Sequence, residues 1–481
     1  MESLWCRTAE KHERESLSGD ITVDAAVIGG GLAGILTAYY LMETGLRVCV
    51  LEAERVGSGQ TKNTTAKITS QHGLIYGRLI KQFGEEHARE YAQANQEAIG
   101  KYRQLVEKHR IDCEWEEKDA YLYSVLDAEP LRQETEAAKR LGIDAEFTTA
   151  DGLPFSVKGA VRFRGQAQFH PLKFLYALAD MVPVYENTKV QKIEKNRAIT
   201  SHGTVTAKHF VIATHYPFVN VPGFYFARIH QERSYVVALE NAAGPDGMYI
   251  GSDAGGYSFR SSGGYLMLGG GKHRTGENSE GGRYDVLREK AAQWYPGSRI
   301  AAQWSAQDCI TLDAIPYIGR FSEAAPDWYV ATGFGKWGMS TAMAAAGIIT
   351  ELITGSGHPY PIFSPQRFVL SAAAKTALTD SAQAVKGIAR GLFGLPRGAV
   401  ESLPAGHGGI VDVDGEKAGV YKDENGEIFA VHTKCPHLGC QLEWNPDERS
   451  WDCPCHGSRF DFRGALIDNP AERNLMQWKL E

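Results

Sequence analysis

The chain is 481 residues long, which exceeds the size of one hydrophobic core and predicts two or three domains. Its 51 basic and 58 acidic residues give a formal net charge of -7, so the chain has no excess positive charge for a nucleic acid, and we expect no such partner. Residues 1–20 are polar, and no apolar run reaches the roughly 18 residues of a membrane span. We therefore expect a cytoplasmic protein with neither a secretory signal nor a membrane span.

The first folded segment has the pattern of a βαβ unit. We expect a strand at residues 23–28, a helix at 32–44 and a second strand at 47–51, with a glycine turn between the first strand and the helix. The turn has the G-x-G-x-x-G spacing of a dinucleotide-binding fold, in which the glycines allow a tight turn, the approach of a pyrophosphate and close helix packing. An acidic residue that ends the second strand is placed to accept from a ribose hydroxyl. The residues assigned to this cofactor site are Gly29, Gly31, Leu32, Ala33, Gly34 and Glu52.

The middle of the chain predicts cap elements and a second domain. Apolar positions spaced three and four apart predict helices at 73–111 and 130–141. Runs of β-branched and aromatic residues predict a mainly antiparallel sheet at 161–270. The α/β pattern then returns, with a strand at 328–331 and a helix at 340–354.

Further motifs accompany the glycine turn. They are a threonine-rich loop at 57–65, His170-Pro171, the strand 211–214, Thr311-Leu312-Asp313 with Pro316 and Gly319, and the turn 331–339. In this order the motifs resemble the D-amino-acid oxidase-like flavoproteins, which include glycine and sarcosine oxidases, over about residues 21–355. The resemblance implies FAD, with the substrate between the flavin ring and the antiparallel sheet. It adds these cofactor-binding residues: Thr61, Thr65, Thr214, Gly333, Trp337, Gly338 and Met339.

The same resemblance suggests how a substrate is held. Family members that take amino or imino acids clamp the carboxylate with an arginine or lysine and often a tyrosine, because a guanidinium binds a planar anion through two hydrogen bonds. Each candidate here also has an ordinary interpretation as an ion pair, strand packing or a satisfied polar side chain. The catalytic candidates are Lys336, Arg260 and Tyr76, with His230 and Tyr257 as further ones.

The cysteines are distributed unevenly. Cys6, Cys49, Cys113 and Cys309 are scattered and are expected to be inert; for Cys309 a buried free thiol is favoured over a covalent link to flavin. The other four crowd the end of the chain, which indicates a metal site.

Two boxes, at residues 435–440 and 453–458, have the spacing C-x-H-x15-C-x-x-H. In a Rieske [2Fe-2S] site of this pattern, two thiolates hold one iron and two imidazoles hold the other. Zinc is the alternative, but a Cys2His2 finger separates its cysteine pair from its histidine pair, whereas each box here supplies one Cys and one His.

The two extra cysteines extend the resemblance to the Rieske proteins of the cytochrome bc complexes. It implies the ligands Cys435, His437, Cys453 and His456 and a disulfide between Cys440 and Cys455, which is unusual for a cytoplasmic protein. Ser458 matches a family serine that donates to a bridging sulfide, whereas Phe460 replaces a donor tyrosine, and Asn469-Pro470 matches the shielding loop. With one hydrogen bond missing, we expect a potential below the top of the Rieske range of about -150 to +300 mV.

The expected fold class is an α/β Rossmann-type FAD-binding domain with an antiparallel-sheet substrate domain, plus a small all-β Rieske domain. Residues 1–355 form the oxidoreductase, with Rossmann parts at about 21–75, 150–220 and 305–355; residues 356–395 form a linker with a helix, and residues 396–481 form the Rieske domain. Lys375, Lys386 and Arg390 lie on the linker helix, which we expect to pack on a domain rather than on a membrane surface.

The combination predicts an FAD-dependent dehydrogenase or oxidase of a small amine or amino acid that passes electrons one at a time to the cluster and then to an unidentified protein acceptor. The alternative is an electron-transfer or reductase component that relays electrons between a partner and the cluster without an organic substrate. A Rieske oxygenase is rejected, because no suitable helical histidine pair for a mononuclear iron lies outside the cluster motif.

Overall fold

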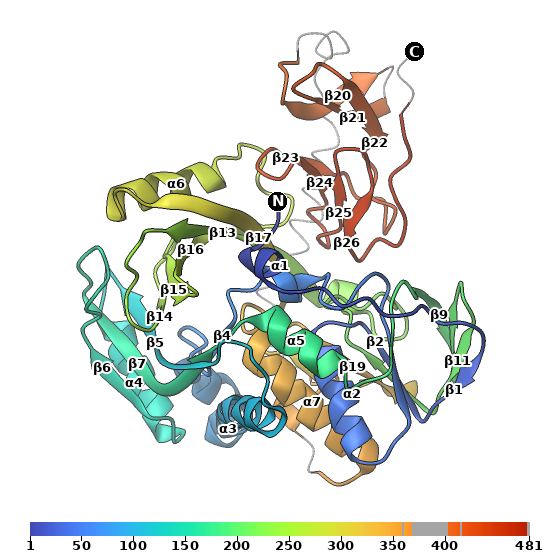
Figure 1. Cartoon of the computed structure of the whole chain (residues 1–481), viewed down its shortest axis with the longest axis horizontal. Coiled ribbons are helices and arrows are strands. Elements are labelled where there is room, and N and C mark those ends of the chain that lie inside the picture. The colour runs from blue at the N-terminus through green and yellow to red at the C-terminus, as the bar shows by residue number, and fades with distance from the viewer. Residues whose placement is uncertain (358–359, 368–402, 414–415, 479–481) are drawn as a thin grey trace.

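A six-stranded sheet with four parallel neighbour pairs forms the centre of the N-terminal part of the protein. The computed structural model describes residues 1–357, 360–367, 403–413 and 416–478. Helices α2 (Leu32–Glu43) and α7 (Gly338–Thr354) pack against each other and against this sheet (Figure 1). The strand order is β18 (Tyr317–Ser322), β19 (Ala325–Thr332), β12 (His209–Ile212), β2 (Ala25–Ile28), β3 (Val48–Leu51) and β8 (Val184–Tyr185).

The predicted βαβ unit is therefore present as β2, α2 and β3. The three inner strands β12, β2 and β3 are fully buried and, apart from His209, apolar, as expected for a parallel sheet covered on both faces. A small four-stranded sheet extends this half at its edge. It consists of β1 (Ile21–Thr22), β11 (Thr204–Thr206), β10 (Arg197–Thr200) and β9 (Val190–Glu194).

A nine-stranded, mostly antiparallel sheet forms the second half of the N-terminal part. Its strands follow the order β17 (Arg299–Thr311), β13 (Ile229–Glu240), β16 (Tyr265–Arg274), β15 (Ser258–Ser262), β14 (Met248–Gly251), β5 (Glu116–Ser124), β7 (Gly159–Gln168) and β4 (Lys67–Ile68), with β6 (Ala145–Thr148) beside β7. The predicted antiparallel sheet is present, but its bounds were wrong. Strands β8 to β12, which lie within the expected segment 161–270, belong to the other two sheets, whereas β4, β5, β6 and β17 join this sheet from outside the segment. In addition, β14 pairs with β5 in parallel.

The predicted helices are also present. The helix expected at 73–111 is α3 (Tyr76–His109), which kinks at Gly84, and the one expected at 130–141 is α4 (Glu129–Arg140). The other helices within the described residues are α1 (Leu4–Thr8), α5 (Pro171–Ala179), α6 (Arg283–Trp294) and the short 3-10 turns η1 (Gln60–Asn63), η2 (Tyr225–Ala227) and η3 (Pro361–Phe363). None of the helices in the described ranges is long and apolar enough to cross a membrane.

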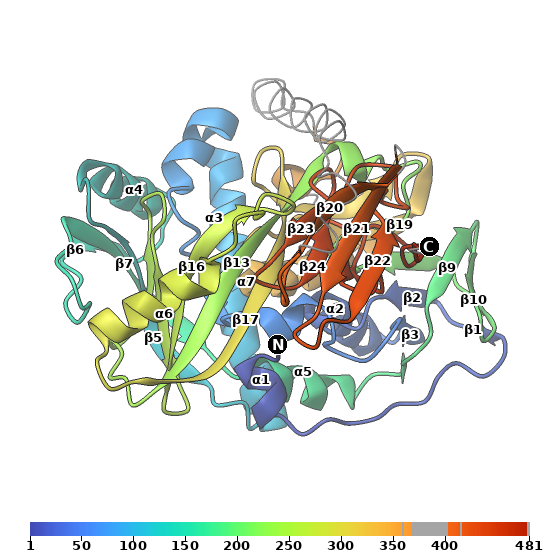
Figure 2. The same cartoon turned by 90° about the horizontal axis from the view of Figure 1, so that it is seen from above.

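The C-terminal part, residues 403–478, is built from two small antiparallel sheets. Aromatic rings contribute much of its core: Trp444 stacks on Tyr421 and is tilted by 54° to Trp451. Figures 1 and 2 show this part, in orange and red, lying over β13 and β17. The strands are β20 (Gly408–Val413), β21 (Glu416–Lys422), β22 (Ile428–His432), β23 (Glu443–Asn445), β24 (Ser450–Asp452), β25 (Arg459–Asp461) and β26 (Leu466–Asp468). The predicted linker helix with Lys375, Lys386 and Arg390 lies outside the described residues.

Candidate flavin and iron-sulfur sites

The glycine turn between β2 and α2 packs so closely against neighbouring backbone that no residue with a side chain fits at two of its glycines. A Cβ at Gly29, whose φ is +110°, would lie 2.6 Å from the Ala213 carbonyl oxygen, and a Cβ at Gly34 would overlap the Gly29 carbonyl oxygen. At Gly31 the nearest atom to such a Cβ is the Thr61 hydroxyl oxygen at 3.4 Å. The backbone is thus open at the start of α2, where a pyrophosphate group binds in dinucleotide folds.

Glu52 fixes this turn from the carboxyl end of β3. Its carboxylate accepts hydrogen bonds from the Gly30 N–H at 2.6 Å and the Glu54 N–H at 2.9 Å. Burial raises the pKa of the Glu52 carboxyl. Across the turn, the Thr61 hydroxyl oxygen accepts from the Leu32 N–H at 3.1 Å. The predicted residues Gly31, Leu32, Glu52 and Thr61 therefore lie together.

A second turn follows β19 at the same edge of the sheet. Gly333 has a φ of +73°, and a Cβ there would overlap the Thr311 side chain. The Gly335 N–H donates to the Cys309 carbonyl oxygen at 2.9 Å, and the Trp337 ring stacks on His72 with centroids 4.7 Å apart. Because Gly333 and Thr214 both follow parallel strands, they reach the carboxyl edge where ligands bind in open α/β sheets.

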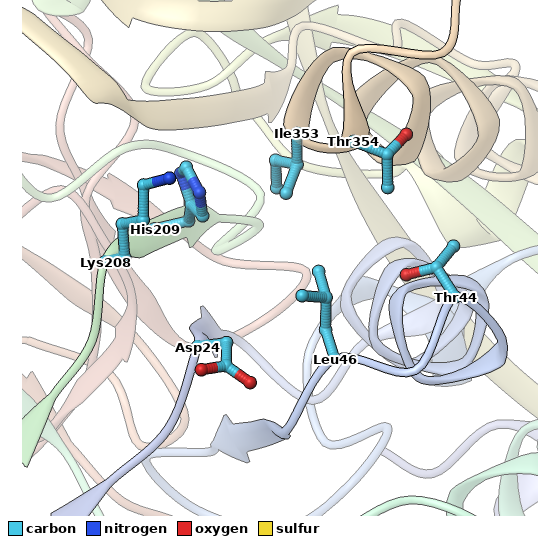
Figure 3. Close-up of a pocket in the computed structure, with 7 residues that line it drawn as sticks. All are labelled: Asp24, Thr44, Leu46, Lys208, His209, Ile353 and Thr354. Atoms are coloured by element: carbon cyan, nitrogen blue, oxygen red, sulfur yellow. The ribbon is translucent and has the colours of Figure 1, made fainter.

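The opposite edge of the same sheet carries a cavity of about 370 Å³ (Figure 3). It lies at the amino ends of the strands, since Asp24 precedes β2 and Lys208 precedes β12. It is therefore distinct from the predicted cofactor edge. Its lining residues are Asp24, Thr44, Leu46, Lys208, His209, Ile353 and Thr354.

The two Cys/His boxes form matching loops in the C-terminal part. In each loop the N–H of a glycine with positive φ donates to the carbonyl oxygen of the first cysteine: Gly439 to Cys435 and Gly457 to Cys453, both at 2.9 Å. The loops are joined by a disulfide between Cys440 and Cys455, as the resemblance implied.

The four residues predicted to hold the cluster form two close pairs in these loops, one of cysteines and one of histidines. Cys435 and Cys453 are buried free thiols, and the neighbouring Cys453 side chain lowers the pKa of Cys435 to about 7. The His437 and His456 rings lie 4.9 Å apart and are perpendicular. The Nδ1 atom of His437 is buried and has no hydrogen-bond partner within the described part of the chain. Two thiols, two imidazoles and an orphaned ring nitrogen fit a Rieske cluster better than a finger-type zinc site.

A hub of three glutamines connects the cluster loops to the N-terminal part. The Gln231 amide on β13 donates to the His456 carbonyl oxygen at 2.7 Å, and the Gln307 amide on β17 donates to the Gly457 carbonyl oxygen at 2.8 Å. Gln307 also donates to the Gln231 side chain at 2.6 Å, and its N–H donates to the Gln60 side chain at 2.9 Å. Gln60 belongs to the threonine-rich loop, so the hub links that loop to the cluster.

Buried charges accompany the hub at this interface. Arg233 on β13 pairs with Glu448 of the C-terminal part, and their side chains are 2% and 9% exposed. Arg459 bonds to Glu448 at 3.1 Å and to Asp468 at 2.9 Å. Burial raises the pKa of Glu448, but Arg233 and Arg459 outweigh burial and hold it at about 2. The two parts are thus joined by desolvated, fully charged groups.

Comparison with known proteins decides the family. The sequence model described as FAD dependent oxidoreductase matches residues 24–352, and the one described as Rieske [2Fe-2S] domain matches residues 395–479. The chain belongs to the FAD-dependent oxidoreductase family. The oxidoreductase accordingly has FAD and a [2Fe-2S] cluster as its cofactors.

Three known proteins illustrate the relationship. YhfW of Bacillus subtilis (strain 168), which bears the name of a Rieske 2Fe-2S iron-sulfur protein, is 37% identical over 100% of this chain and 98% of its own length. Gamma-glutamylputrescine oxidoreductase of Escherichia coli (strain K12) is 23% identical over 75% of this chain and 91% of its own. The crystal structure of glycine oxidase from Geobacillus kaustophilus is similar with a TM-score of 0.62 at 19% identity, over 72% of this chain and 99% of that one.

The predicted catalytic residues of the oxidoreductase lie in three different surroundings. Tyr76 is fully buried and donates to the Ser70 carbonyl oxygen at 2.5 Å. Arg260 is fully buried and donates to the Gln168 side chain at 3.0 Å, to the Phe169 carbonyl oxygen at 2.7 Å and to the Thr65 carbonyl oxygen. These bonds occupy both side chains, so substrate contact by Tyr76 or Arg260 stays a prediction.

Lys336 belongs to the turn after β19 and is about a third exposed, at 32% of its side chain. Its ammonium bonds to Asp308 at 2.8 Å and lies 3.5 Å from Glu232. Burial lowers the pKa of Lys336, but Asp308 and Glu232 outweigh it and the net shift is upward. Among the other candidates, His230 lies 3.9 Å from Glu232, Tyr257 packs edge-on to Trp294, and Cys309 is a buried free thiol.

Lys67 on β4 is a further candidate that sequence patterns do not point to. Its ammonium donates to the Ser258 hydroxyl at 2.7 Å and to the Thr65 hydroxyl at 3.1 Å, and no carboxylate in the described ranges forms an ion pair with it. Burial, reinforced by the nearby Arg260 charge, lowers the pKa of Lys67 to about 7. Its position two residues after Thr65 is the only sequence signal for it, because Ser258 is 191 residues away.

Proposed function

We propose that this protein oxidises a small amine or amino acid at FAD and passes the electrons one at a time to its own Rieske cluster. FAD supplies the two-electron step, and the cluster exchanges electrons singly with an acceptor protein. Cys435, His437, Cys453 and His456 hold the cluster, and the protein works in the cytoplasm. The substrate carbon gives up a hydrogen with its bonding electron pair, which is the two-electron equivalent that FAD would accept, and the substrate nitrogen gives up a proton. A C=N bond forms as these leave, and water then hydrolyses the imine.

The observation that carries the proposal is the short bonded connection between the two predicted cofactor sites. Gly335, in the predicted flavin turn, donates to the carbonyl of Cys309. The Cys309 thiol lies 3.8 Å from the Gln231 side chain, which in turn donates to the carbonyl of His456. Such a connection between two redox centres supports electron transfer within one chain.

The flavin-binding residues proposed here are the predicted ones at the carboxyl edge of the six-stranded sheet. They are Gly29, Gly31, Leu32, Ala33, Gly34, Glu52, Thr61, Thr65, Thr214, Gly333, Trp337, Gly338 and Met339. The likeness to glycine oxidase and gamma-glutamylputrescine oxidoreductase supports amines and amino acids as the substrate class.

The test is rapid mixing of the oxidised holoprotein, without oxygen, with glycine, other amino acids and polyamine derivatives. Absorption follows bleaching of the flavin, and electron paramagnetic resonance (EPR) of frozen samples follows reduction of the cluster. We expect one substrate to bleach the flavin, with the cluster signal growing as fast as or just after bleaching. Bleaching without a cluster signal would remove the internal electron transfer from the proposal.

If no organic compound reduces the flavin, and NADH with a reductase or a reduced ferredoxin quickly reduces both centres, the protein is instead an electron carrier.

Gln231→Leu tests the connection itself. We expect the same bleaching rate and cluster reduction slowed about tenfold or more, a barrier increase of about 1.4 kcal/mol. Gln133→Leu, on the exposed face of α4, is the matched control and should change neither rate.

A further inference from the structure

The outer side of one predicted iron ligand is covered by the N-terminal part. The Nε2 atom of His437 lies 3.2 Å from the Oδ1 atom of Asn220, in the segment between β12 and η2. The Phe226 ring of η2 stands nearly perpendicular to both histidine rings, with centroids 6.4 Å from His437 and 6.0 Å from His456. The histidine side of the cluster site therefore faces the flavin-binding part.

The bond to Asn220 fixes the tautomer of His437. An amide oxygen can only accept, so the Nε2 atom carries the hydrogen and donates it to Oδ1. The Nδ1 atom then keeps its lone pair, and this is the buried ring atom without a hydrogen-bond partner in the described residues. A neutral imidazole with one free nitrogen is the form that binds a metal, and a partner on the other nitrogen orients the ring.

The segment that carries Asn220 is itself held in place. The Phe224 N–H donates to the Asn220 carbonyl oxygen at 2.8 Å, which closes a turn. Upstream, the Tyr216 carbonyl oxygen accepts from the Asn469 side chain of the C-terminal part at 2.9 Å. Asn220 thus has a defined position relative to His437, and its bond crosses the interface between the two parts.

We propose that Asn220 is a positioning residue that sets the reduction potential of the cluster from the flavin-binding part. An acceptor on the Nε2–H makes the imidazole a stronger donor to iron, which stabilises the oxidised form and lowers the potential. The bond would act on the iron that the two imidazoles would hold, because Asn220 bonds to one of those two ligands. The proposal depends on the ligand assignment but not on the organic substrate.

The test is an anaerobic redox titration of the full-length holoprotein, followed by EPR. Asn220→Ala removes the acceptor and should raise the potential, by up to about tenfold in the reduction equilibrium, or about 59 mV for a one-electron couple. Asn220→Asp supplies a stronger, anionic acceptor and should shift the potential the opposite way. Pulsed EPR should show altered coupling of a histidine nitrogen in both variants.

Lys189→Ala is the control for docking, because it removes a different bond across the interface, from the Lys189 ammonium to the Glu472 carbonyl oxygen at 2.9 Å. It should leave the potential unchanged. The proposal is overturned if the two Asn220 variants keep the wild-type potential, if they shift it in the same direction, or if Lys189→Ala shifts it equally. Iron content is measured in parallel. If one variant has lost the cluster, the potential of the other variant tests the proposal.

Discussion

Lys67 has a pKa well below that of an ordinary lysine, which makes it a candidate for proton transfer. It lies between hydroxyl groups of Ser258 and Thr65, near the Arg260 guanidinium, and its pKa is lowered to about 7. A lysine of this kind is neutral in half of the molecules near pH 7, so it can accept a proton from a substrate ammonium group. Lys67 bonds to Thr65, a residue of the predicted flavin loop, and we therefore predict that Lys67 lies beside the reaction site.

We predict that the rate of flavin reduction rises with pH through about 7, since the amine of Lys67 accepts protons only above its pKa. Lys67→Met should remove this rise and slow flavin reduction by roughly 100-fold or more above pH 8. Stopped-flow measurements with a reducing substrate at several pH values test this. Lys158→Met, at an exposed position, should keep the wild-type profile. An unchanged profile in Lys67→Met would assign the proton transfer elsewhere.

The cluster environment gives a second prediction for single residues. Phe460 on β25 is fully buried in the core that contains Cys435 and Cys453. Its ring donates no hydrogen bond to sulfur, so we expect a potential below the upper end of the Rieske range of about +300 mV. Phe460→Tyr adds a donor and should raise the potential, by about tenfold in equilibrium or about 59 mV. Redox titration tests this, with Phe462→Tyr, in the turn just after β25, as the control that should show no shift.

At the scale of elements, close backbone approach positions the cluster loops on the nine-stranded sheet. A Cβ at Gly276, just after β16, would lie 2.6 Å from the Pro454 backbone, and a Cβ at Gly457 would lie 2.6 Å from the Gln231 side chain. Glycine at these positions lets the loop 453–458 reach β13 and β17. The contact between cluster loop and sheet therefore depends on small residues from both parts.

Gly276→Ala should separate these elements. Gly276 has a φ of +81°, so alanine also strains the backbone, and Gly255→Ala is the matched control because Gly255 has a φ of +78° with no atom within 4 Å of a Cβ. We expect Gly276→Ala to slow electron transfer from flavin to cluster by about tenfold or more, a barrier increase of about 1.4 kcal/mol. Gly255→Ala should leave that rate unchanged. Equal rates in both variants would mean that this contact is not needed.

The same elements explain what sequence could and could not predict. The glycine turn, Glu52 and the two Cys/His boxes are recognisable because their spacing along the chain alone meets the geometric need of the site. Lys67, Asn220 and Gln231 were missed because each acts through a partner about 200 residues away: the separations are 191 to Ser258, 217 to His437 and 225 to His456. Arg260 and Tyr76 were predicted from residue type alone. Residue type does not show that both side chains already donate hydrogen bonds to backbone carbonyl oxygens.

At the scale of the whole molecule, the buried charges at the interface hold the two parts together. Glu448 accepts from Arg233 and Ser305 of the N-terminal part and pairs with Arg459 of its own part. Removing one member of such a network leaves the others charged and desolvated, which costs far more than loss of a surface ion pair. Docking of the cluster onto the flavin-binding part is therefore sensitive to a single carboxylate.

Glu448→Gln should lower the free energy of unfolding by about 3–5 kcal/mol, because Arg233 and Arg459 lose their common anion. Glu424→Gln, which breaks the exposed Arg449–Glu424 pair, should cost less than about 1 kcal/mol. The pKa of Glu448 is about 2 in the folded protein, below its ordinary value of 4.5. Its contribution is therefore complete above about pH 4.5 and is lost as the pH falls toward 2. Calorimetry from pH 7 downward should show that the difference in unfolding free energy between wild type and Glu448→Gln shrinks below pH 4.5. If that difference stays constant with pH, the carboxylate charge does not hold the interface.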